Sequence, residues 1–286
     1  MTSAAPVLVS AHWLQEHLGS PGLVILDASW YLPADGRDCR AEFANAHIPG
    51  ALFFAIEELV DRNSDLPHML PPAGEFTTAM RSLGVNAGDR VVVYDTSGVF
   101  SAPRAWWMFR IFGHRNISVL DGGLPAWRRA GGRLVATADE HGSERRAGDF
   151  TASAPDQTLL RSMAQVRDAI GDGDSQVLDA RSAPRFRGEV PESRPGLRSG
   201  HMPGALNLHY AQVLDADSKT LLSPDVLKQR FLDSGLDLQK PVITTCGSGI
   251  SACLLSLALA HATGKEAAVY DGSWAEWGRE PELPVE

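Results

Sequence analysis

A cysteine between two apolar stretches is the residue in this chain best placed to do chemistry. Cys246 follows Pro241-Val-Ile-Thr-Thr, which is typical of a buried strand, and precedes Gly247-Ser-Gly-Ile-Ser251 and a stretch typical of a helix. Loop glycines let several backbone N–H groups turn inward, and the start of a helix adds positive partial charge. Both effects favour the thiolate, so we predict that Cys246 is a nucleophile; a buried, inert cysteine is the alternative.

Composition narrows the class of protein. The chain has 286 residues, a formal charge of −9 and 44% hydrophobic residues, an ordinary globular composition long enough for two domains. The negative charge argues against nucleic-acid and anionic-membrane partners. Cys39, Cys246 and Cys253 form no CxxC pair, so we expect neither a disulfide framework nor a metal site.

The N-terminal sequence bears on the compartment. It has no basic segment followed by an apolar core, and no window approaches the roughly 18 apolar residues of a membrane span. With an odd number of cysteines, these features lead us to expect a protein of the reducing cytoplasm.

The two halves of the chain resemble each other in order and spacing. His47-Ile-Pro-Gly-Ala matches His201-Met-Pro-Gly-Ala, and Asp121-Gly-Gly-Leu-Pro-Ala-Trp matches Asp271-Gly-Ser-Trp-Ala-Glu-Trp. Runs at Val24 and Val91 also recur, and all offsets lie between 150 and 154 residues. So narrow a range predicts a duplicated domain.

Each half alternates short runs rich in Val, Ile and Leu with helical stretches, the pattern of a parallel sheet covered by helices on both faces. We therefore predict an α/β fold of two tandem domains, each a parallel sheet flanked by helices. The expected limits are 1–140 for the first domain, 141–157 for a polar linker and 158–286 for the second domain. Ligands of such sheets bind beyond the carboxyl ends of the strands, where Cys246 is expected.

The halves differ at the position of the cysteine. Asp95 matches Cys246, so the first half cannot form a thiolate there. We predict that the second half is catalytic and that the first is inactive. Two binding modules with an incidental cysteine are the alternative.

These motifs together resemble the two-domain rhodanese family and, more narrowly, the 3-mercaptopyruvate sulfurtransferases. The resemblance rests on the tandem halves, Cys246-Gly-Ser-Gly-Ile-Ser-Ala, the His-x-Pro-Gly-Ala repeats and Tyr270-Asp-Gly-Ser-Trp-x-Glu-Trp, and it covers about residues 8–285. It implies two rhodanese-like domains and no cofactor. It also implies that the Cys246 thiolate takes sulfur from 3-mercaptopyruvate, releases pyruvate and holds a persulfide. A thiol such as thioredoxin, a low-molecular-weight thiol or cyanide then accepts the sulfur.

The loop after Cys246 bears on the sulfur donor. Relatives that prefer thiosulfate resemble Cys-Arg-Lys-Gly-Val here, whereas Gly247 and Ser248 are neutral. A neutral loop suits an organic monoanion with a carbonyl group, whose polar atoms meet hydroxyl and backbone donors. The loop residues expected to bind substrate are Gly247, Gly249, Ile250 and Ser251.

The resemblance also implies two arginines for the substrate carboxylate, Arg185 and Arg194. Arg187 is the less certain neighbour, because Glu189 or Glu192 could draw its side chain away. Solvated or salt-bridged arginines are the alternative for each.

A hydroxyl–imidazole–carboxylate relay is the last expectation from the resemblance. It would link Ser248 to His68 and Asp61, with Asp65 as an alternative carboxylate, and would supply a proton or polarise the substrate carbonyl. A packed or capping histidine is the competing interpretation of His68.

Three other functions compete with mercaptopyruvate sulfur transfer. A cysteine phosphatase would need an arginine six residues after the nucleophile, where this chain has Ala252. A thiosulfate-preferring sulfurtransferase remains an alternative, because related enzymes overlap in substrate. The third is a carrier that receives its persulfide from a partner protein and turns over no small donor.

Overall fold

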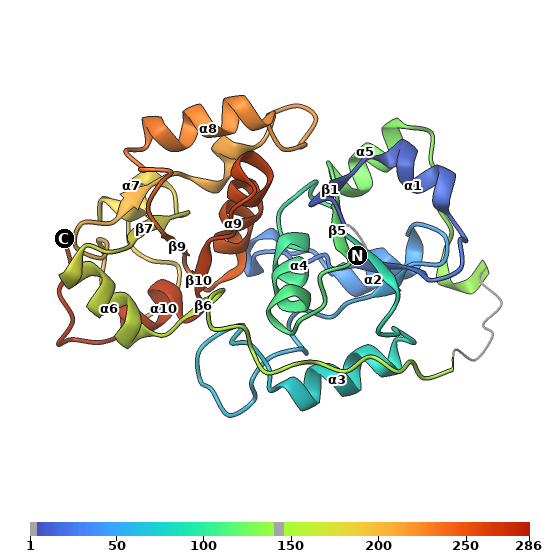
Figure 1. Cartoon of the computed structure of the whole chain (residues 1–286), viewed down its shortest axis with the longest axis horizontal. Helices are drawn as coiled ribbons and strands as arrows, with labels where there is room; N and C mark the ends of the chain where they lie inside the picture. Colours follow the sequence, from blue (N-terminus) through green and yellow to red (C-terminus); the bar gives the residue numbers. More distant parts are fainter. Residues whose placement is uncertain (1–4, 140–145) are drawn as a thin grey trace. The chain divides into compact units, whose positions relative to one another are not determined.

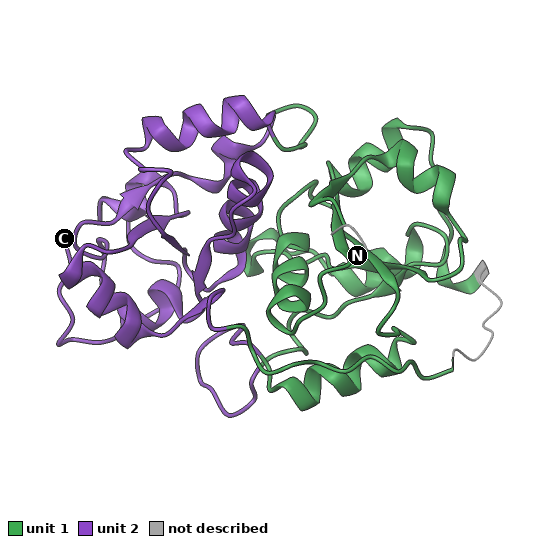
Figure 2. Ribbon diagram, viewed as in Figure 1, with its two compact units in different colours: residues 1–60, 71–156, 216–221 green, residues 61–70, 157–215, 222–286 purple. Residues whose placement is uncertain are grey.

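The computed structural model describes residues 5–139 and 146–286. It divides into two compact units that are not contiguous in sequence (Figure 2). The first unit comprises residues 1–60, 71–156 and 216–221, and the second comprises 61–70, 157–215 and 222–286. Residues 141–145 of the expected linker lie outside the described residues, and the domain limits drawn from the sequence stay a prediction.

Each unit is built on a parallel sheet of five strands. The strands of the first unit are β1 (Leu8–Val9), β2 (Leu23–Asp27), β3 (Leu52–Phe53), β4 (Arg90–Tyr94) and β5 (Ile117–Leu120). Those of the second are β6 (Leu160–Arg161), β7 (Gln176–Asp179), β8 (Leu206–Asn207), β9 (Val242–Thr245) and β10 (Ala268–Tyr270). The orders β1-β5-β4-β2-β3 and β6-β10-β9-β7-β8 are the same, strand for strand. The predicted duplicated α/β fold is confirmed.

Helices flank both sheets (Figure 1). The first unit contains α1 (Ala11–His17), α2 (Cys39–Asn45), α3 (Ala73–Ser82), α4 (Ala102–Ile111) and α5 (Gly123–Arg129). The second contains α6 (Met163–Asp172), α7 (Ala183–Phe186), α8 (Pro224–Asp233), α9 (Ile250–Thr263) and α10 (Ser273–Trp277). Short 3₁₀ turns cover Pro33–Asp35, Thr137–Asp139 and Tyr210–Val213. Helix α4 packs on β4 and β5, and α9 packs on β9 and β10, so the two units repeat this contact as well.

Local sequence explains where the equivalent helices α1 and α6 begin. The Ser10 hydroxyl accepts the N–H of Trp13, and the Ser162 hydroxyl accepts that of Gln165. Gln165 also caps the N–H of Ser162 in return. Such bonds satisfy the first orphan donors of a helix.

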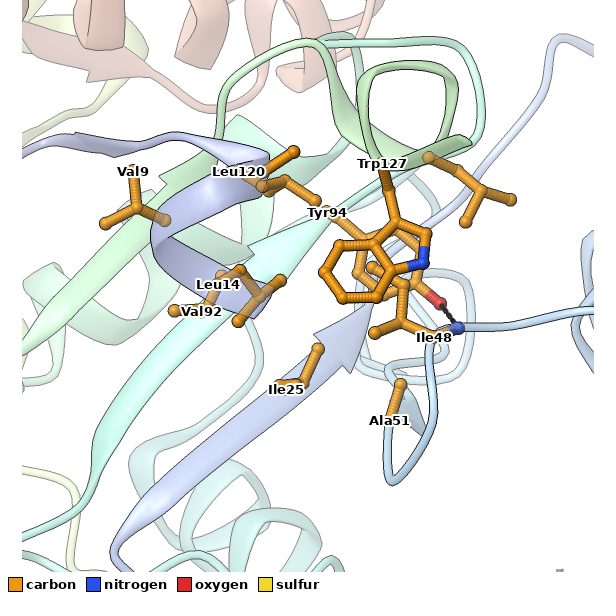
Figure 3. Close-up of a cluster of buried hydrophobic side chains, with 11 residues drawn as sticks. Val9, Leu14, Ile25, Ile48, Ala51, Val92, Tyr94, Leu120 and Trp127 are labelled. Atoms are coloured by element: carbon orange, nitrogen blue, oxygen red, sulfur yellow. Dashed lines mark hydrogen bonds between the residues drawn. The ribbon is translucent and has the colours of Figure 1, made fainter. Parts of the chain in front are cut away.

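Aromatic side chains from the C-terminal helix of each unit close its core. In the first unit, Trp127 of α5 packs over Tyr94 and the aliphatic residues of the central strands (Figure 3). The Tyr94 hydroxyl accepts the N–H of Ile48 across this cluster. In the second unit, Trp274 and Trp277 of α10 occupy the corresponding cluster. Burial of such large rings is a main contribution to the stability of each unit.

The central strand pairs bring two chain positions together at one edge. Asp27 pairs with Tyr94 in the first sheet, and Asp179 pairs with Thr245 in the second. The strand order reverses between these strands, which is where open α/β sheets bind ligands. The residues that follow β4 and β9 are Asp95 and Cys246.

The Asp27 carboxyl yields a test of the first unit. Burial raises its pKa from 3.8 to about 6, although hydrogen bonds from Ser29 oppose the rise. Folding therefore favours the protonated acid, and this contribution to stability is lost as pH rises through about 6. We expect the stability of Asp27→Asn to rise relative to wild type between pH of about 4 and 7, by up to about 3 kcal/mol. Urea unfolding across this range measures the difference; a difference independent of pH would contradict the assignment.

Candidate active site

Cys246 occupies the turn between β9 and α9 and is 2% exposed. Its N–H donates to the Ser273 hydroxyl at 3.2 Å, and its carbonyl accepts the N–H of Trp274 at 2.9 Å. The next carbonyl, of Gly247, accepts the N–H of Ala275. The start of α10 therefore holds the backbone of the cysteine loop at consecutive residues.

In the matching turn of the first unit, backbone N–H groups bind a side-chain carboxylate of the chain itself. The Asp95 carboxylate accepts N–H bonds of 2.7 to 2.9 Å from Ser97, Phe100, Ser101 and Ala102. Burial raises the pKa of Asp95, and these four donors oppose the shift. The start of α4 is thus an occupied anion site.

The two turns share sequence and backbone conformation. Ser97-Gly98-Val99 aligns with Ser248-Gly249-Ile250, and both glycines have positive φ, at 115° and 80°. Glycine is the residue that adopts this conformation without strain. Gly249 directly precedes α9, as the sequence predicted for the loop.

A chain of buried charges leads from the end of β7 to Arg185. The Arg181 guanidinium binds Asp179 and Glu192, both at 2.7 Å, and lies 4.2 Å from the ring centre of Trp274. The other Glu192 oxygen accepts a bond from Arg185. The side chains of Asp179, Arg181 and Glu192 are only 1–2% exposed, whereas that of Arg185 is 30% exposed. Glu192 therefore anchors the one arginine of this chain of charges that reaches an accessible position.

Arg185 also lies against the cysteine loop. A side-chain carbon added at Gly247 would lie 3.2 Å from its Nη2 atom, so glycine gives the guanidinium its room. The Arg185 Nε atom is buried and has no hydrogen-bond partner. An unused donor beside the loop is available to an oxygen of a ligand.

Arg194 is the second cation near the sulfur. Burial lowers its pKa, negative charge on Cys246 raises it, and the charge of Arg185 lowers it further. Within residues 5–139 and 146–286, no hydrogen bond engages its guanidinium. His209 lies beside Arg185, and burial and that charge lower its pKa, which favours neutral imidazole.

Ser248 and His68 meet in the second unit although 180 residues separate them. The His68 Nδ1 atom lies 3.2 Å from the Ser248 hydroxyl and 3.3 Å from its carbonyl. Both residues are buried, at 8% and 7% exposed. His68 has φ of 61°, a conformation that non-glycine residues adopt at a cost.

The two expected carboxylates, Asp61 and Asp65, make other contacts among the described residues. Asp61 accepts the N–H of Asn63 with its carboxylate and donates its own N–H to the Met69 carbonyl. Asp65 forms an exposed ion pair with Arg279 at 2.5 Å.

Two histidines and a cysteine outside the site make contacts typical of structural residues. The His47 and His201 rings each stack on a phenylalanine, Phe43 or Phe186, and bond to its carbonyl. The Cys253 thiol donates to the carbonyl of the residue four positions earlier, inside α9.

Arg187 pairs with Glu189 at the surface, where both side chains are about half exposed. Of the two acids considered from the sequence, Glu192 is committed to Arg181 and Arg185 instead. The sequence prediction had overlooked Arg181 and Glu192 as parts of the site. A signal for Arg181 existed, because Asp179-Ala-Arg181 replaces the Asp-Ala-Ser at residues 27–29 of the first half.

Two features are absent from the described part of the chain. No cluster of His, Cys, Asp and Glu side chains there could hold a metal ion. No helix there has the length and apolar character required to span a membrane.

The two units define a two-domain α/β protein that carries a loop cysteine in one domain only. Residues 10–130 and 162–280 each match the family model of the rhodanese-like domain. The chain therefore belongs to the rhodanese family, as its motifs predicted.

Relatives support this placement over nearly the whole chain. A 3-mercaptopyruvate sulfurtransferase of Escherichia coli is 43% identical over 280 residues, which are 97% of each chain. A thiosulfate sulfurtransferase of Gallus gallus is 44% identical over 277 residues, covering 94% of this chain and 92% of the relative. The crystal structure of an Escherichia coli 3-mercaptopyruvate sulfotransferase matches with a TM-score of 0.84 and 41% identity, covering 95% of this chain and all of that one.

The buried Glu192 yields a test with a matched control. Glu192→Gln removes the charge that holds Arg185, so we expect KM for 3-mercaptopyruvate to rise about tenfold with a smaller change in kcat. Stability should fall by about 3 kcal/mol, because two arginines lose a buried partner. Glu189→Gln breaks only the exposed pair with Arg187 and should leave both quantities unchanged. Steady-state kinetics and urea unfolding of both variants measure these effects. Equal changes in KM for Glu192→Gln and Glu189→Gln would show that the buried pair does not position Arg185.

Proposed function

We propose that the protein is a 3-mercaptopyruvate sulfurtransferase that transfers sulfur through a persulfide on Cys246 and releases pyruvate. The observation that carries the proposal is the placement of Cys246 beside Arg185 and the uncommitted Arg194, within a loop that is itself neutral. The names of relatives that match nearly the whole chain support the same donor.

The proposed reaction has two transfers. The Cys246 thiolate attacks the thiol sulfur of 3-mercaptopyruvate, an S–S bond forms, and the C–S bond breaks with its electron pair on carbon. The resulting pyruvate enolate takes up a proton and leaves as pyruvate. An acceptor thiolate or cyanide then attacks the outer sulfur, and the electron pair of the S–S bond returns to Cys246 as thiolate.

The cations would bind the carboxylate of the donor. Arg194 has no hydrogen-bond partner within the described residues, and Arg185 keeps a buried, unused Nε donor. Arginine forks match carboxylate geometry, so the pair would hold the substrate with its sulfur towards Cys246.

The loop would stabilise the sulfur anion. In the first unit, the equivalent turn directs four N–H groups at the Asp95 carboxylate. We infer that Gly247, Gly249, Ile250 and Ser251 give the second unit a comparable turn around the thiolate and the persulfide.

Ser248 and His68 would act at the carbonyl end of the substrate. Their contact, at 3.2 Å, allows the hydroxyl to polarise the carbonyl while the imidazole supplies or receives a proton. Asp61 would complete the relay through the carboxylate oxygen that does not accept the N–H of Asn63.

The acceptor would be a thiol, either a thioredoxin-like protein or a low-molecular-weight thiol. Cys39, Cys246 and Cys253 form no disulfide in the described part of the chain, which suits the reducing cytoplasm that we propose as the compartment. A relative in Arabidopsis thaliana is named as mitochondrial, and that organelle is the competing compartment.

Thiosulfate is the second candidate donor, because a thiosulfate sulfurtransferase is among the relatives. The neutral Gly247 and Ser248 argue against a compact dianion, whereas Arg185 and Arg194 are equally available to one. Direct comparison of the two donors is therefore the decisive experiment.

Sulfur transfer to cyanide from 3-mercaptopyruvate and from thiosulfate tests the proposal. We expect kcat/KM to favour 3-mercaptopyruvate by about tenfold or more, or about 1.4 kcal/mol of transition-state preference. Cys246→Ser should abolish transfer, and mass spectrometry should detect one added sulfur on wild type only. Cys253→Ser is the matched control and should keep its activity, because that thiol bonds inside α9.

Each contrary outcome has a distinct meaning. A preference for thiosulfate would overturn the choice of donor, and activity in Cys246→Ser would overturn the nucleophile. No turnover of either donor, with sulfur accepted only from a protein persulfide, would indicate a carrier.

A further inference from the structure

We propose that Asp271 is a positioning residue that sets the His68 imidazole over the cysteine loop. The inference deepens the proposed function and rests on it for its catalytic consequence. Asp271 directly follows β10 and is 2% exposed. Its carboxylate accepts the N–H of Leu70 at 2.7 Å, two residues beyond His68.

The bond to Asp271 is one of the contacts that place the segment carrying His68 in the second unit. Residues 61–70 lie in the first half of the sequence but group with residues 157–215 and 222–286. The segment is short and has no helix or strand of its own, so a charge-assisted bond to a buried carboxylate helps to hold it.

The first unit contains the same arrangement without an active cysteine. Asp121, the repeat equivalent of Asp271, accepts the N–H of Leu221 at 2.8 Å. Leu221 lies 151 residues after Leu70, in the segment 216–221 that groups with the first unit. Residues 61–70 thus group with the second unit and residues 216–221 with the first. Each segment is bound by the aspartate of the repeated Asp-Gly motif in the unit that it joins.

The equivalence extends to backbone conformation and to the target. His68 and Lys219, also 151 residues apart, have φ of 61° and 58°. Lys219 lies against Gly98, where an added side-chain carbon would approach its Cβ to 2.4 Å. Gly98 aligns with Gly249, which follows the Ser248 that His68 contacts.

The strain of His68 makes its placement depend on the bonds around it. A left-handed conformation is costly for a non-glycine residue and persists only where neighbours impose it. Two neighbouring bonds do so here, from Leu70 to Asp271 and from Asp61 N–H to the Met69 carbonyl. Loss of the first would let the backbone relax and the imidazole move from Ser248.

Asp271 is also connected to the nucleophile. Ser273 and Trp274, two and three residues further on, bind the N–H and the carbonyl of Cys246. Residues 271–274 therefore hold both the cysteine loop and segment 61–70, which carries His68. We infer that they set the distance between the imidazole and the reacting sulfur.

The catalytic test compares two variants that break equivalent bonds. Asp271→Ala should lower kcat and kcat/KM for pyruvate release together by about tenfold or more, because misplacing a positioned group slows chemistry. Asp121→Ala removes the equivalent bond of the first unit and should leave both within about twofold of wild type. In a His68→Ala background, Asp271→Ala should cause no further loss, as expected for two residues that act through one group. An equal, additive loss in that background would overturn the proposal.

Two further measurements keep the inference testable. If Asp271→Ala does not fold, Asp271→Asn keeps a weaker, neutral acceptor and should cause about a threefold loss that again vanishes without His68. The ring resonance of His68, assigned by its absence in His68→Ala, should shift in the Asp271 variants and not in Asp121→Ala. An unmoved resonance would overturn the positioning role, whatever donor the enzyme uses, whereas an inactive wild type would overturn only the proposed function.

Discussion

The turn from the central strand into a helix is the constraint that the two units share, and in the first unit backbone N–H groups converge there on a carboxylate. A helix that begins there leaves donors without intrahelical partners, and a buried site must satisfy them. In the first unit, Asp95 supplies a permanent carboxylate, so the site is complete without a ligand. In the second, the same strand, turn and helix present Cys246, whose charge and substituent can change during a reaction. The two units thus share the turn and differ in the residue that it presents.

A second difference between the units lies one strand away. Asp27 ends β2, and its carboxyl group has hydrogen bonds with Ser29 and with the side chain of Tyr94, which are uncharged partners. Asp179 ends β7 and binds Arg181, which continues to Glu192 and from there to Arg185. Buried ion pairs contribute little net stability, but they restrict where a side chain can point. The second unit uses them to direct one guanidinium at the loop.

Sequence reasoning reached the fold and singled out Cys246 because both follow from local patterns. Strand composition, the repeat and the turn after Val242–Thr245 are all legible in consecutive residues. The sequence does not identify the partners of Glu192, since Arg187 is nearer to it in sequence than Arg185, yet the buried carboxylate binds Arg185. The contact of His68 with Ser248 was expected from family resemblance alone, because no pattern in the chain predicts that residues 61–70 group with the second unit. Asp271 belongs to a motif that repeats in the sequence, but its hydrogen-bond partner is a backbone N–H. Nearly every residue carries such a group, so the sequence does not identify the partner.

The electrostatics of Arg194 connect these features to the proposed cycle. Burial disfavours its charged form, and negative charge on Cys246 opposes that effect. In the proposed cycle a persulfide would retain negative charge on the outer sulfur, so Arg194 would face an anion both before and after the first transfer. The carboxylate of a bound donor would add a second anion, whose attraction to the cation would be stronger in the buried site than in water. After sulfur transfer, the pyruvate carboxylate would compete with the persulfide for the same cation. The charge that the enzyme keeps would then favour product release and leave the site ready for an acceptor.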